Sequence, residues 1–246
     1  MRLDKALVER GLCRSRGEAQ AKIDAGEVTV AGVIAVKPSL DVAEGALLAV
    51  LDAGPRWVSR GALKLDAALT SFALDVKGRR ALDVGASTGG FTEVLLARGA
   101  ASVHAVDVGH GQMVPALASD PRVVSREGVN ARTLTPADFP HPFGIIAADV
   151  SFISLTLILP ALGPLLAEGG DLMCLVKPQF EVGPAHLGKN GIVRDPKARA
   201  AALLRVADVA QALGLSEMGR RDSPIAGGEG NVEFLLWLKA SVLETV

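Results

Sequence analysis

Two lysines and two carboxylates stand where a parallel sheet would bring their side chains together. Asp149 ends one predicted strand, and Lys177 ends the next one along the chain. Glu233 lies near the start of the last predicted strand, and if that strand runs antiparallel, its start lies at the edge where the other two end. Lys64 lies on a helix before the first strand, at the border of that helix's apolar stripe. These four side chains are therefore candidate catalytic residues.

Such a set suits the activation of a hydroxyl group. An alcohol is a poor nucleophile and must lose its proton as it attacks an electrophile. An amine can take that proton if burial or a neighbouring cation lowers the pKa of the amine. A second amine can stabilise the developing alkoxide charge, and the carboxylates can orient both amines. The same four residues could instead form two structural ion pairs, so this alternative stays open.

A glycine-rich loop follows the first strand of the same region, where the chain reads DVGASTGGF from Asp83 to Phe91. Glycines allow the backbone to turn sharply and to approach a ligand closely. Asp107 follows Gly85 by 22 residues and ends the second strand, where an acid can accept hydrogen bonds from ribose hydroxyls. The pattern fits a nucleoside cofactor, either NAD or S-adenosylmethionine.

Two departures from the dinucleotide fingerprint favour S-adenosylmethionine over NAD. Ser87 stands where the fingerprint has its second glycine, and Asp83 precedes the loop, which is typical of methyltransferases. Glu127 and Asn130 follow the third strand, near where an adenine would lie, although Asn130 could equally be a turn residue. The candidate cofactor-binding residues are Asp83, Gly85, Ala86, Ser87, Thr88, Gly89, Gly90, Phe91, Asp107, Asn130 and Asp149.

Strands and helices alternate from residue 81 onward. This alternation predicts an α/β domain with an open, mainly parallel, Rossmann-like sheet and helices on both faces. Ligands of such sheets bind beyond the carboxyl ends of the strands, where the candidate residues lie. The predicted strands are Ala81–Val84, Val103–Asp107, Val123–Ser125, Gly144–Asp149, Leu172–Val176 and the segment VEFLLWL that contains Glu233.

The first fifty or so residues predict a separate, small α+β module. One helix ends at Gly11, and a second begins at Ser15, where Ser-x-x-Glu with Glu18 forms a capping box, and stops at Gly26. Three short strands follow, Val28–Val30, Val33–Val36 and Leu47–Leu51. Asp52-Ala53-Gly54-Pro55 has the composition of a linker. We therefore expect domains at 1–54 and 59–246, joined by a linker at 55–58.

The formal net charge of −1 conceals a basic N-terminal third. Residues 1–22 carry a net charge of +3 and residues 55–80 carry +4, so the rest of the chain is net −8. A basic surface of this kind suits a polyanion, and nucleic acid is the commonest one. A merely solvated surface is the alternative.

Other chemistries and a membrane location fit less well. The four histidines show no metal-ligand spacing, the two cysteines lie far apart, and no metal site is predicted. Val150 to Ala167 are 18 uncharged residues, which only just reaches the length of a spanning helix, and the stretch contains Pro160 and Pro164. The N-terminus has no apolar run typical of a signal peptide. We expect a cytoplasmic protein and no membrane partner.

Residues 2–39 resemble the S-four type RNA-binding domain, also called the alpha-L motif. The segment reads RLDKALVERGLCRSRGEAQAKIDAGEVTVAGVIAVKPS and matches that pattern along its length. The resemblance implies that this module binds folded RNA through its helices, mainly by shape and phosphate contacts. A small protein-docking domain is the alternative. The candidate RNA-binding residues are Arg2, Arg14, Ser15, Arg16 and Lys22.

Nearly the whole chain resembles the TlyA, or hemolysin A-like, family. The resembling segments are RWVSRGALKL, LDVGASTGGFTEVLL, AVDVGHGQM, ADVSFISL, LVKPQFE, GIVRD and SPIAGGEGNVEFLLWL, in that order. Members of this family join an S-four domain to an FtsJ-like class I methyltransferase domain. A PITGP segment common in the family reads PIAGG here, from Pro224, so the detail of that loop differs.

The resemblance implies a function and a set of roles. The function is S-adenosylmethionine-dependent methylation of cytidine 2′-hydroxyls in ribosomal RNA of the small or large subunit, or both. The family's Lys-Asp-Lys-Glu catalytic tetrad falls on Lys64, Asp149, Lys177 and Glu233, and its ribose-binding acid falls on Asp107. Ribosomal subunits are the implied partners. Membrane lysis is also reported for family members, so a membrane-active hemolysin is the rival reading.

Overall fold

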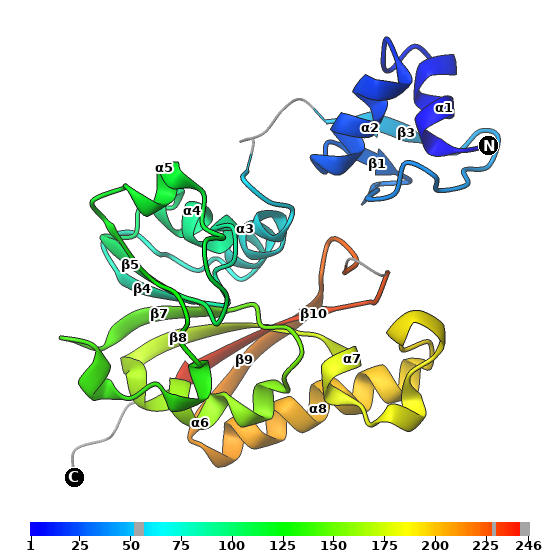
Figure 1. The fold of residues 1–246 in the computed structure, drawn as a ribbon. Coiled ribbons are helices and arrows are strands. Elements are labelled where there is room, and N and C mark those ends of the chain that lie inside the picture. Colours follow the sequence, from blue (N-terminus) through cyan, green and yellow to red (C-terminus); the bar gives the residue numbers. More distant parts are fainter. Residues whose placement is uncertain (52–56, 228–229, 242–246) are drawn as a thin grey trace.

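The computed structural model describes residues 1–51, 57–227 and 230–241. Of the linker predicted at 55–58, residues 55 and 56 lie outside the described residues, as do residues 52–54, which also have the composition of a linker. Figure 1 shows a small N-terminal module beside a larger body built around one sheet. The two parts contact each other near the start of the larger body, where the Arg60 guanidinium lies 3.5 Å from the carbonyl oxygen of Val36.

The N-terminal module has the expected order of elements. Two helices, α1 (Leu3–Glu9) and α2 (Arg16–Asp24), precede a three-stranded antiparallel sheet in the order β2-β1-β3. The strands are β1 (Val28–Val30), β2 (Val33–Ile34) and β3 (Leu48–Val50), so β2 and β3 are shorter than predicted. Ser15 caps α2 by accepting a hydrogen bond from the Glu18 amide, while the Glu18 carboxylate accepts from the Arg14 amide. The predicted cap is confirmed, with its reciprocal bond shifted by one residue.

A buried aspartate holds the two helices of the module together. Asp4 is fully buried on α1 and accepts hydrogen bonds from the side chains of Arg2, Arg16 and Gln20. The Arg2 and Arg16 guanidinium groups hold the pKa of this carboxyl well below its usual range. Two of the candidate RNA-binding arginines thus also stabilise the fold, which the sequence did not reveal.

The larger body contains a seven-stranded sheet in the order β6-β5-β4-β7-β8-β10-β9. The neighbours from β6 through β8 pair in parallel, and β10 runs antiparallel to both β8 and β9. The predicted open, mainly parallel sheet is confirmed, and the last strand has the antiparallel direction that Glu233 needs to reach the shared edge. The strands are β4 (Arg80–Val84), β5 (Ser102–Val106), β6 (Val123–Arg126), β7 (Phe143–Ala148), β8 (Leu166–Val176), β9 (Leu215–Asp222) and β10 (Phe234–Ala240).

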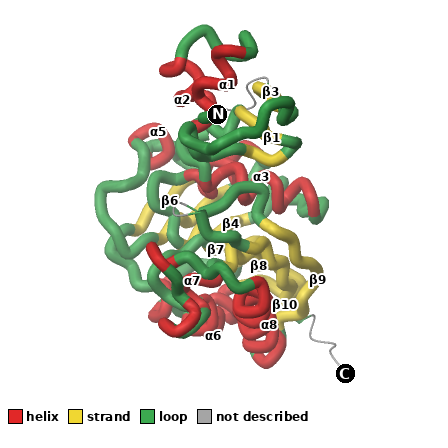
Figure 2. The backbone as a smooth tube through the Cα atoms, turned by 90° about the vertical axis from the view of Figure 1, so that its right-hand side faces the viewer, coloured by secondary structure: helices red, strands yellow, loops and turns green. Residues whose placement is uncertain are grey.

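Helices cover both faces of this sheet, as Figures 1 and 2 show from two directions. On one face, α3 (Gly61–Ser71) and α4 (Gly90–Ala97) pack through Leu65, Leu69 and Leu95. On the other face, α6 (Leu159–Leu162) and α8 (Pro196–Ala212) pack through residues such as Leu159 and Val206. Each fully buried Leu contributes about 1.5–3 kcal/mol, so these two layers hold the strand ends in fixed positions. The remaining helices in the described part of the chain are α5 (Pro115–Ala118), α7 (Pro178–Glu181) and six short 3-10 segments.

Two features of the body differ from the sequence prediction. The edge strand β9 was not predicted, because its sequence LSEMGRRD is mostly polar and lacks the alternation of a half-buried strand. Strand β8 begins at Leu166, six residues before the predicted start at Leu172. Gly169 and Gly170 are residues typical of a turn, but in the structure they lie within the strand. The stretch from Val150 to Ala167 forms a loop, three short helical segments and the first two residues of β8, and Pro160 and Pro164 lie near the starts of two of those segments. No helix among the described residues is long and apolar enough to cross a membrane.

Candidate active site

The sheet brings together the ends of the strands that carry the candidate catalytic residues. Asp149 directly follows β7, Lys177 directly follows β8, and Glu233 directly precedes β10. Strands β7 and β8 pair in parallel, whereas Phe234 at the start of antiparallel β10 lies opposite Val176 at the end of β8. All three residues therefore reach the same edge of the sheet, and α3 supplies Lys64 beside them.

The four side chains form two ion pairs. The Lys64 amine donates a hydrogen bond to Glu233 Oε2 at 2.5 Å, and the Lys177 Nζ atom lies 2.5 Å from Asp149 Oδ1. Lys64, Lys177 and Glu233 are buried, while Asp149 keeps part of its side chain exposed. Two buried lysines at one sheet edge are unusual, because desolvated charges persist only when they are paired.

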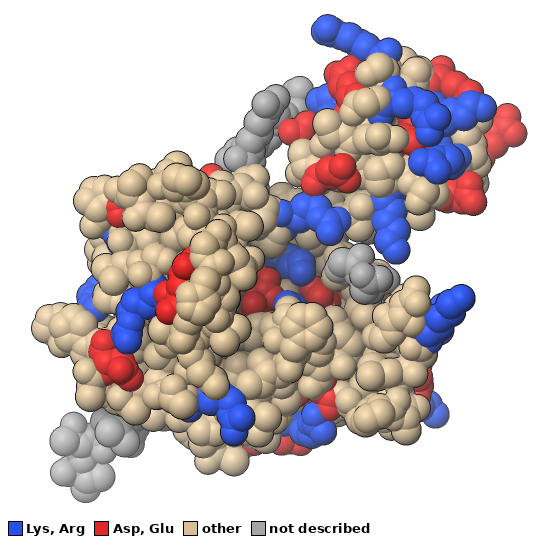
Figure 3. Space-filling model, in the orientation of Figure 1, with Lys and Arg blue, Asp and Glu red and all other residues tan. Residues whose placement is uncertain are grey.

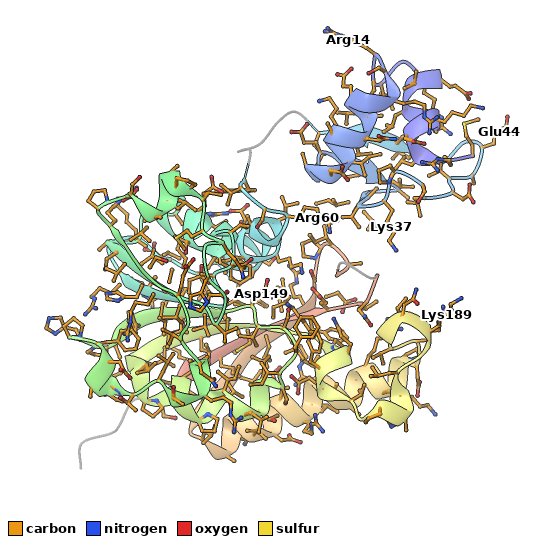
Figure 4. All side chains as sticks on the ribbon, in the orientation of Figure 1. Arg14, Lys37, Glu44, Arg60, Asp149 and Lys189 are labelled. Carbon is orange, nitrogen blue, oxygen red and sulfur yellow. The ribbon has the colours of Figure 1, made fainter. Side chains whose placement is uncertain are left out.

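A cavity of about 290 Å³ opens at this edge and joins the tetrad to the glycine-rich loop. Figure 3 shows the hollow below the N-terminal module, and Figure 4 places Asp149 there with Arg60 above it. The cavity is lined by Ser59, Arg60, Gly61, Lys64, Gly85, Ala86, Ser87, Thr88, Gly90, Phe91, Asp149, Ile225 and Ala226. Two tetrad residues and most of the predicted cofactor loop thus share one space.

The glycine-rich loop needs glycine at Gly85 for two reasons. Its backbone has φ of +85°, a region that residues with a side chain rarely adopt. The backbone also packs so closely on the next strand end that a Cβ atom on Gly85 would lie within 3 Å of the Asp149 carbonyl group. The loop is therefore pressed against the residue that carries one of the candidate catalytic carboxylates.

Three of the predicted cofactor-contacting residues organise the neighbouring loops. Asp107 accepts hydrogen bonds from the Ser87 amide at 2.8 Å and the Gly109 amide at 2.7 Å, so it links two loops of the site. Glu127 accepts from the amides of residues 111 and 112. Asn130 caps a 3-10 turn by accepting from the Arg132 amide, which is the turn role kept open above. These three residues do not line the cavity described above.

Asp83 lies beneath the loop rather than in the cavity. It is fully buried, its Oδ2 atom accepts a hydrogen bond from the Thr92 hydroxyl at 2.6 Å, and its Oδ1 atom has no partner. Burial raises the pKa of Asp83 to about 7, against the opposing hydrogen bond from Thr92 and with a further contribution from Asp149. The Asp83 carboxyl under the loop therefore changes its protonation state near pH 7.

The raised pKa of Asp83 predicts a specific pH dependence of stability. The folded protein holds this proton up to about pH 7, whereas the unfolded chain releases it near pH 4. Between these values the native state binds more protons, so the free energy of unfolding should fall as pH rises, by up to about 1.4 kcal/mol per pH unit. Urea unfolding at several pH values measures this slope, and Asp83→Asn should flatten it. An equal slope in both proteins would contradict the assignment.

Several residues of the site were missed by the sequence prediction. Ser151 accepts a hydrogen bond from the Lys177 amine at 2.8 Å. Phe152 has a positive φ of 63°, its side chain is 91% exposed, and its ring centroid lies 5.2 Å from that of Phe180. Glu181 is buried and accepts from the Ser154 hydroxyl and the Leu155 amide. The segments ADVSFISL and LVKPQFE contain these residues, but the sequence alone does not indicate their contacts.

The geometry fits a nucleoside cofactor that carries a positive centre. One part of the cavity wall is the glycine-rich loop, which has no side chain at Gly85, where it packs most closely on Asp149. Another part is the Asp149 carboxylate, whose Oδ1 atom has no aligned hydrogen bond. Asp107 adds an acidic group beside the same loop, where it accepts a hydrogen bond from the Ser87 amide. The Asp149 carboxylate can attract a cation such as a sulfonium, and the cations Arg60 and Lys64 line the same cavity.

Family models match both parts of the chain. Residues 57–240 match the FtsJ-like methyltransferase model, and residues 1–48 match the S4 domain model. The 16S/23S rRNA (cytidine-2′-O)-methyltransferase TlyA of Mycobacterium tuberculosis is 52% identical over 97% of this chain and 89% of its own length. Hemolysin A of Brachyspira hyodysenteriae is 39% identical over 96% of this chain and 98% of its own length.

Solved structures agree with the family models. A Streptococcus thermophilus protein described as a hemolysin has a TM-score of 0.76 and 43% identity, over 98% of this chain and 88% of that one. A Pyrococcus horikoshii protein described as an RNA methyltransferase has a TM-score of 0.52 at 15% identity, over 78% of this chain and 88% of that one, which shows the shared fold alone. From these matches and the two-part fold, the chain belongs to the TlyA family of FtsJ-like methyltransferases that carry an S-four domain.

Proposed function

We propose that this methyltransferase uses S-adenosylmethionine to methylate the ribose 2′-hydroxyl of cytidine in ribosomal RNA of the small or large subunit, or both. The single observation that carries the proposal is the meeting of the Lys64–Glu233 and Lys177–Asp149 pairs beside the cavity of the glycine-rich loop. Two amines held by two carboxylates suit proton removal from an alcohol, and a ribose hydroxyl is the alcohol that RNA offers.

Each tetrad residue has a distinct role in this proposal. The neutral amine of Lys177 accepts the 2′-hydroxyl proton as the oxygen attacks the methyl group, and Asp149, which lines the cavity, holds that amine beside it. The Lys64 ammonium stabilises the negative charge that develops on the oxygen, and Glu233 fixes the Lys64 side chain. Bound S-adenosylmethionine supplies the electrophilic methyl group and leaves as the thioether.

The candidate cofactor-binding residues also have distinct roles in this proposal. The backbone of the loop from Gly85 to Phe91, which lines the cavity, would hold the cofactor, and Asp107 would accept hydrogen bonds from its ribose hydroxyls. Asp83 supports the loop from below through Thr92. Asn130 stays a candidate for the adenine end, in addition to the turn that it caps.

We also propose that the N-terminal module, residues 1–54, docks on folded ribosomal RNA, and that residues 55–58 join it to the catalytic domain, 59–246. The candidate RNA-binding residues of this module differ in how far other contacts already engage their side chains. Arg2 and Arg16 are tied to Asp4, Lys22 lies 3.2 Å from the Glu27 carboxylate, and Ser15 caps α2. Arg14 is exposed, and Figure 4 shows its side chain pointing away from the larger body. A ribosomal RNA substrate implies a cytoplasmic location.

Charge reversal at Arg14 tests RNA docking with the least disturbance of the fold, because the Arg14 side chain is exposed. Arg14→Glu should weaken binding to ribosomal RNA about tenfold at low salt, because it replaces an attraction to phosphate by a repulsion. Binding of S-adenosylmethionine should stay within twofold, since Arg14 lies far from the cavity. Filter binding and calorimetry measure the two affinities. Arg16→Glu is the informative comparison, because it also places a second acid beside buried Asp4 and should lower the melting temperature. Equal loss of both affinities in Arg14→Glu would indicate misfolding instead.

The function itself is tested by methyl transfer from labelled S-adenosylmethionine to unmodified small subunits, large subunits and naked ribosomal RNA. Label should enter RNA in at least one of the three, and the preferred substrate identifies the subunit. Leakage of dye-loaded lipid vesicles serves as the test of a hemolysin. Vesicle leakage without any label in RNA would contradict the proposal.

A further inference from the structure

The two ion pairs of the tetrad differ in one contact. The Lys64 amine has Glu233 as its hydrogen-bond partner among the described residues. The Lys177 amine has two neighbours, the Asp149 carboxylate at 2.5 Å and the Ser151 hydroxyl at 2.8 Å. Lys177 and Ser151 are 26 residues apart in the chain and meet only because the ends of two strands lie side by side in the folded protein. The second contact is present on the lysine that the proposed function assigns as the base.

Ser151 lies on a loop that is fixed at both ends. At its start, the Asp149 amide donates to the Val84 carbonyl and continues the hydrogen bonding of the sheet. At its end, buried Glu181 accepts from the Ser154 hydroxyl at 2.6 Å and the Leu155 amide at 2.8 Å. Between these anchors the loop turns at Phe152, whose φ of 63° a bulky residue adopts only when its surroundings impose it. The hydroxyl of Ser151 is therefore held at a defined position.

The number of hydrogens on an amine makes this position significant. A neutral amine has two N–H groups and one lone pair. Ser151 accepts one N–H of neutral Lys177, and the Asp149 carboxylate attracts the other without an aligned hydrogen bond, so the lone pair points in the remaining direction. Without Ser151, the amine can turn about its Cε–Nζ bond and spread the lone pair over several directions. General-base catalysis requires the lone pair to face the proton that it removes.

We propose that Ser151 is a positioning residue that aims the lone pair of Lys177 at the substrate hydroxyl. This inference rests on the proposed function and deepens it. In the step that it serves, the ribose O–H bond breaks as the N–H bond of the Lys177 ammonium forms. The oxygen bonds to the methyl carbon, and the electrons of the broken carbon–sulfur bond stay on the sulfur. Ser151 accepts a hydrogen bond from Lys177 before and after proton transfer and gains or loses no proton itself.

Three variants separate positioning from simple loop structure. Ser151→Ala removes the acceptor, Ser151→Thr keeps a hydroxyl at the same place, and Ser154→Ala removes a hydroxyl of the same loop that contacts Glu181 instead of Lys177. The single-turnover rate of methyl transfer to the preferred ribosomal substrate is measured against pH for each. The KM for that substrate, the Kd for S-adenosylmethionine and the melting temperature are measured alongside.

Ser151→Ala should lower the single-turnover rate about 10- to 100-fold, within the range of general-base effects, with KM and Kd within about twofold of the parent. The acid limb of its pH–rate profile should move to lower pH, because the ammonium form of Lys177 loses an acceptor. Ser151→Thr should recover most of the rate. Ser154→Ala should stay within about threefold of the parent, because the Leu155 amide still anchors the end of the loop on Glu181.

Two results would overturn the inference. One is a Ser151→Ala protein with the parent's rate and pH profile, and the other is a Ser154→Ala protein as slow as Ser151→Ala, which would assign the effect to loop order. Failure of the proposed function is distinguishable, because then the parent protein itself transfers no methyl group to any ribosomal substrate.

Discussion

Lys177→Ala is expected to reduce methyl transfer at least 10³-fold while S-adenosylmethionine still binds within a fewfold of the parent affinity. The amine is the proposed proton acceptor, and removal of a general base lowers rates about 10²- to 10⁴-fold. The same change leaves the partly buried Asp149 without its cation. The loop from Gly85 to Phe91, by contrast, keeps its contacts, and Lys177 does not line the cavity. Single-turnover rates and calorimetric binding separate the two effects.

Arginine replacements identify what each lysine contributes. Arginine keeps the positive charge but is never deprotonated under these conditions, so Lys177→Arg should be as inactive as Lys177→Ala. Lys64→Arg should retain a measurable fraction of the rate, because charge stabilisation needs the cation and not a free lone pair. If Lys177→Arg stays active while Lys64→Arg does not, the roles of the two lysines are reversed. If both arginine variants stay active, neither lysine is the base.

Gly85→Ala is expected to weaken cofactor binding strongly and to destabilise the larger domain. The positive φ alone costs about 1–2 kcal/mol for a residue with a Cβ atom. The added carbon would also press on the Asp149 carbonyl group, which is backbone and cannot rotate away. The loop and the end of β7 must then separate, which displaces a tetrad carboxylate as well. Calorimetric titration should show binding weakened more than tenfold, together with a lower melting temperature.

Gly78→Ala is the matched control for this substitution. Gly78 also has a positive φ, +72°, but a Cβ atom there would meet no other atom within 4 Å. It should therefore show the backbone strain of about 1–2 kcal/mol without the clash, and cofactor binding should be unchanged. A Gly85→Ala protein that binds S-adenosylmethionine like the Gly78→Ala protein would show that close packing on Asp149 is unimportant.

The part of the site that the sequence predicted depends on strand topology. A parallel sheet aligns the carboxyl ends of its strands, so the positions of Asp149 and Lys177 after two apolar strands were enough to bring them together. The antiparallel β10 then delivers Glu233 to the same edge. The glycine pattern likewise predicted a loop whose conformation only glycine tolerates, as the φ of Gly85 confirms.

What the sequence did not predict are contacts between side chains on separate elements. The pairing of Arg16 with Asp4 joins two helices across a loop, so spacing along one helix does not indicate it. Three hydroxyl side chains lie close together in this part of the sequence, on Ser151, Ser154 and Thr156. Only the structure shows that Ser151 is the one that accepts a hydrogen bond from Lys177. Strand β9 was missed because an edge strand with solvent on most of its surface needs few apolar residues.

The central claim is that the methyl group goes to a ribose oxygen, and alkaline hydrolysis of the labelled RNA tests it most directly. Alkali cleaves RNA by attack of the free 2′-hydroxyl on the neighbouring phosphate, so a 2′-O-methyl group protects the bond that follows it. Ribosomal RNA is methylated with labelled S-adenosylmethionine, hydrolysed completely and separated by size. We expect the label in hydrolysis-resistant dinucleotides that begin with cytidine. Label released in mononucleotides would show base methylation and would contradict the roles proposed for the tetrad.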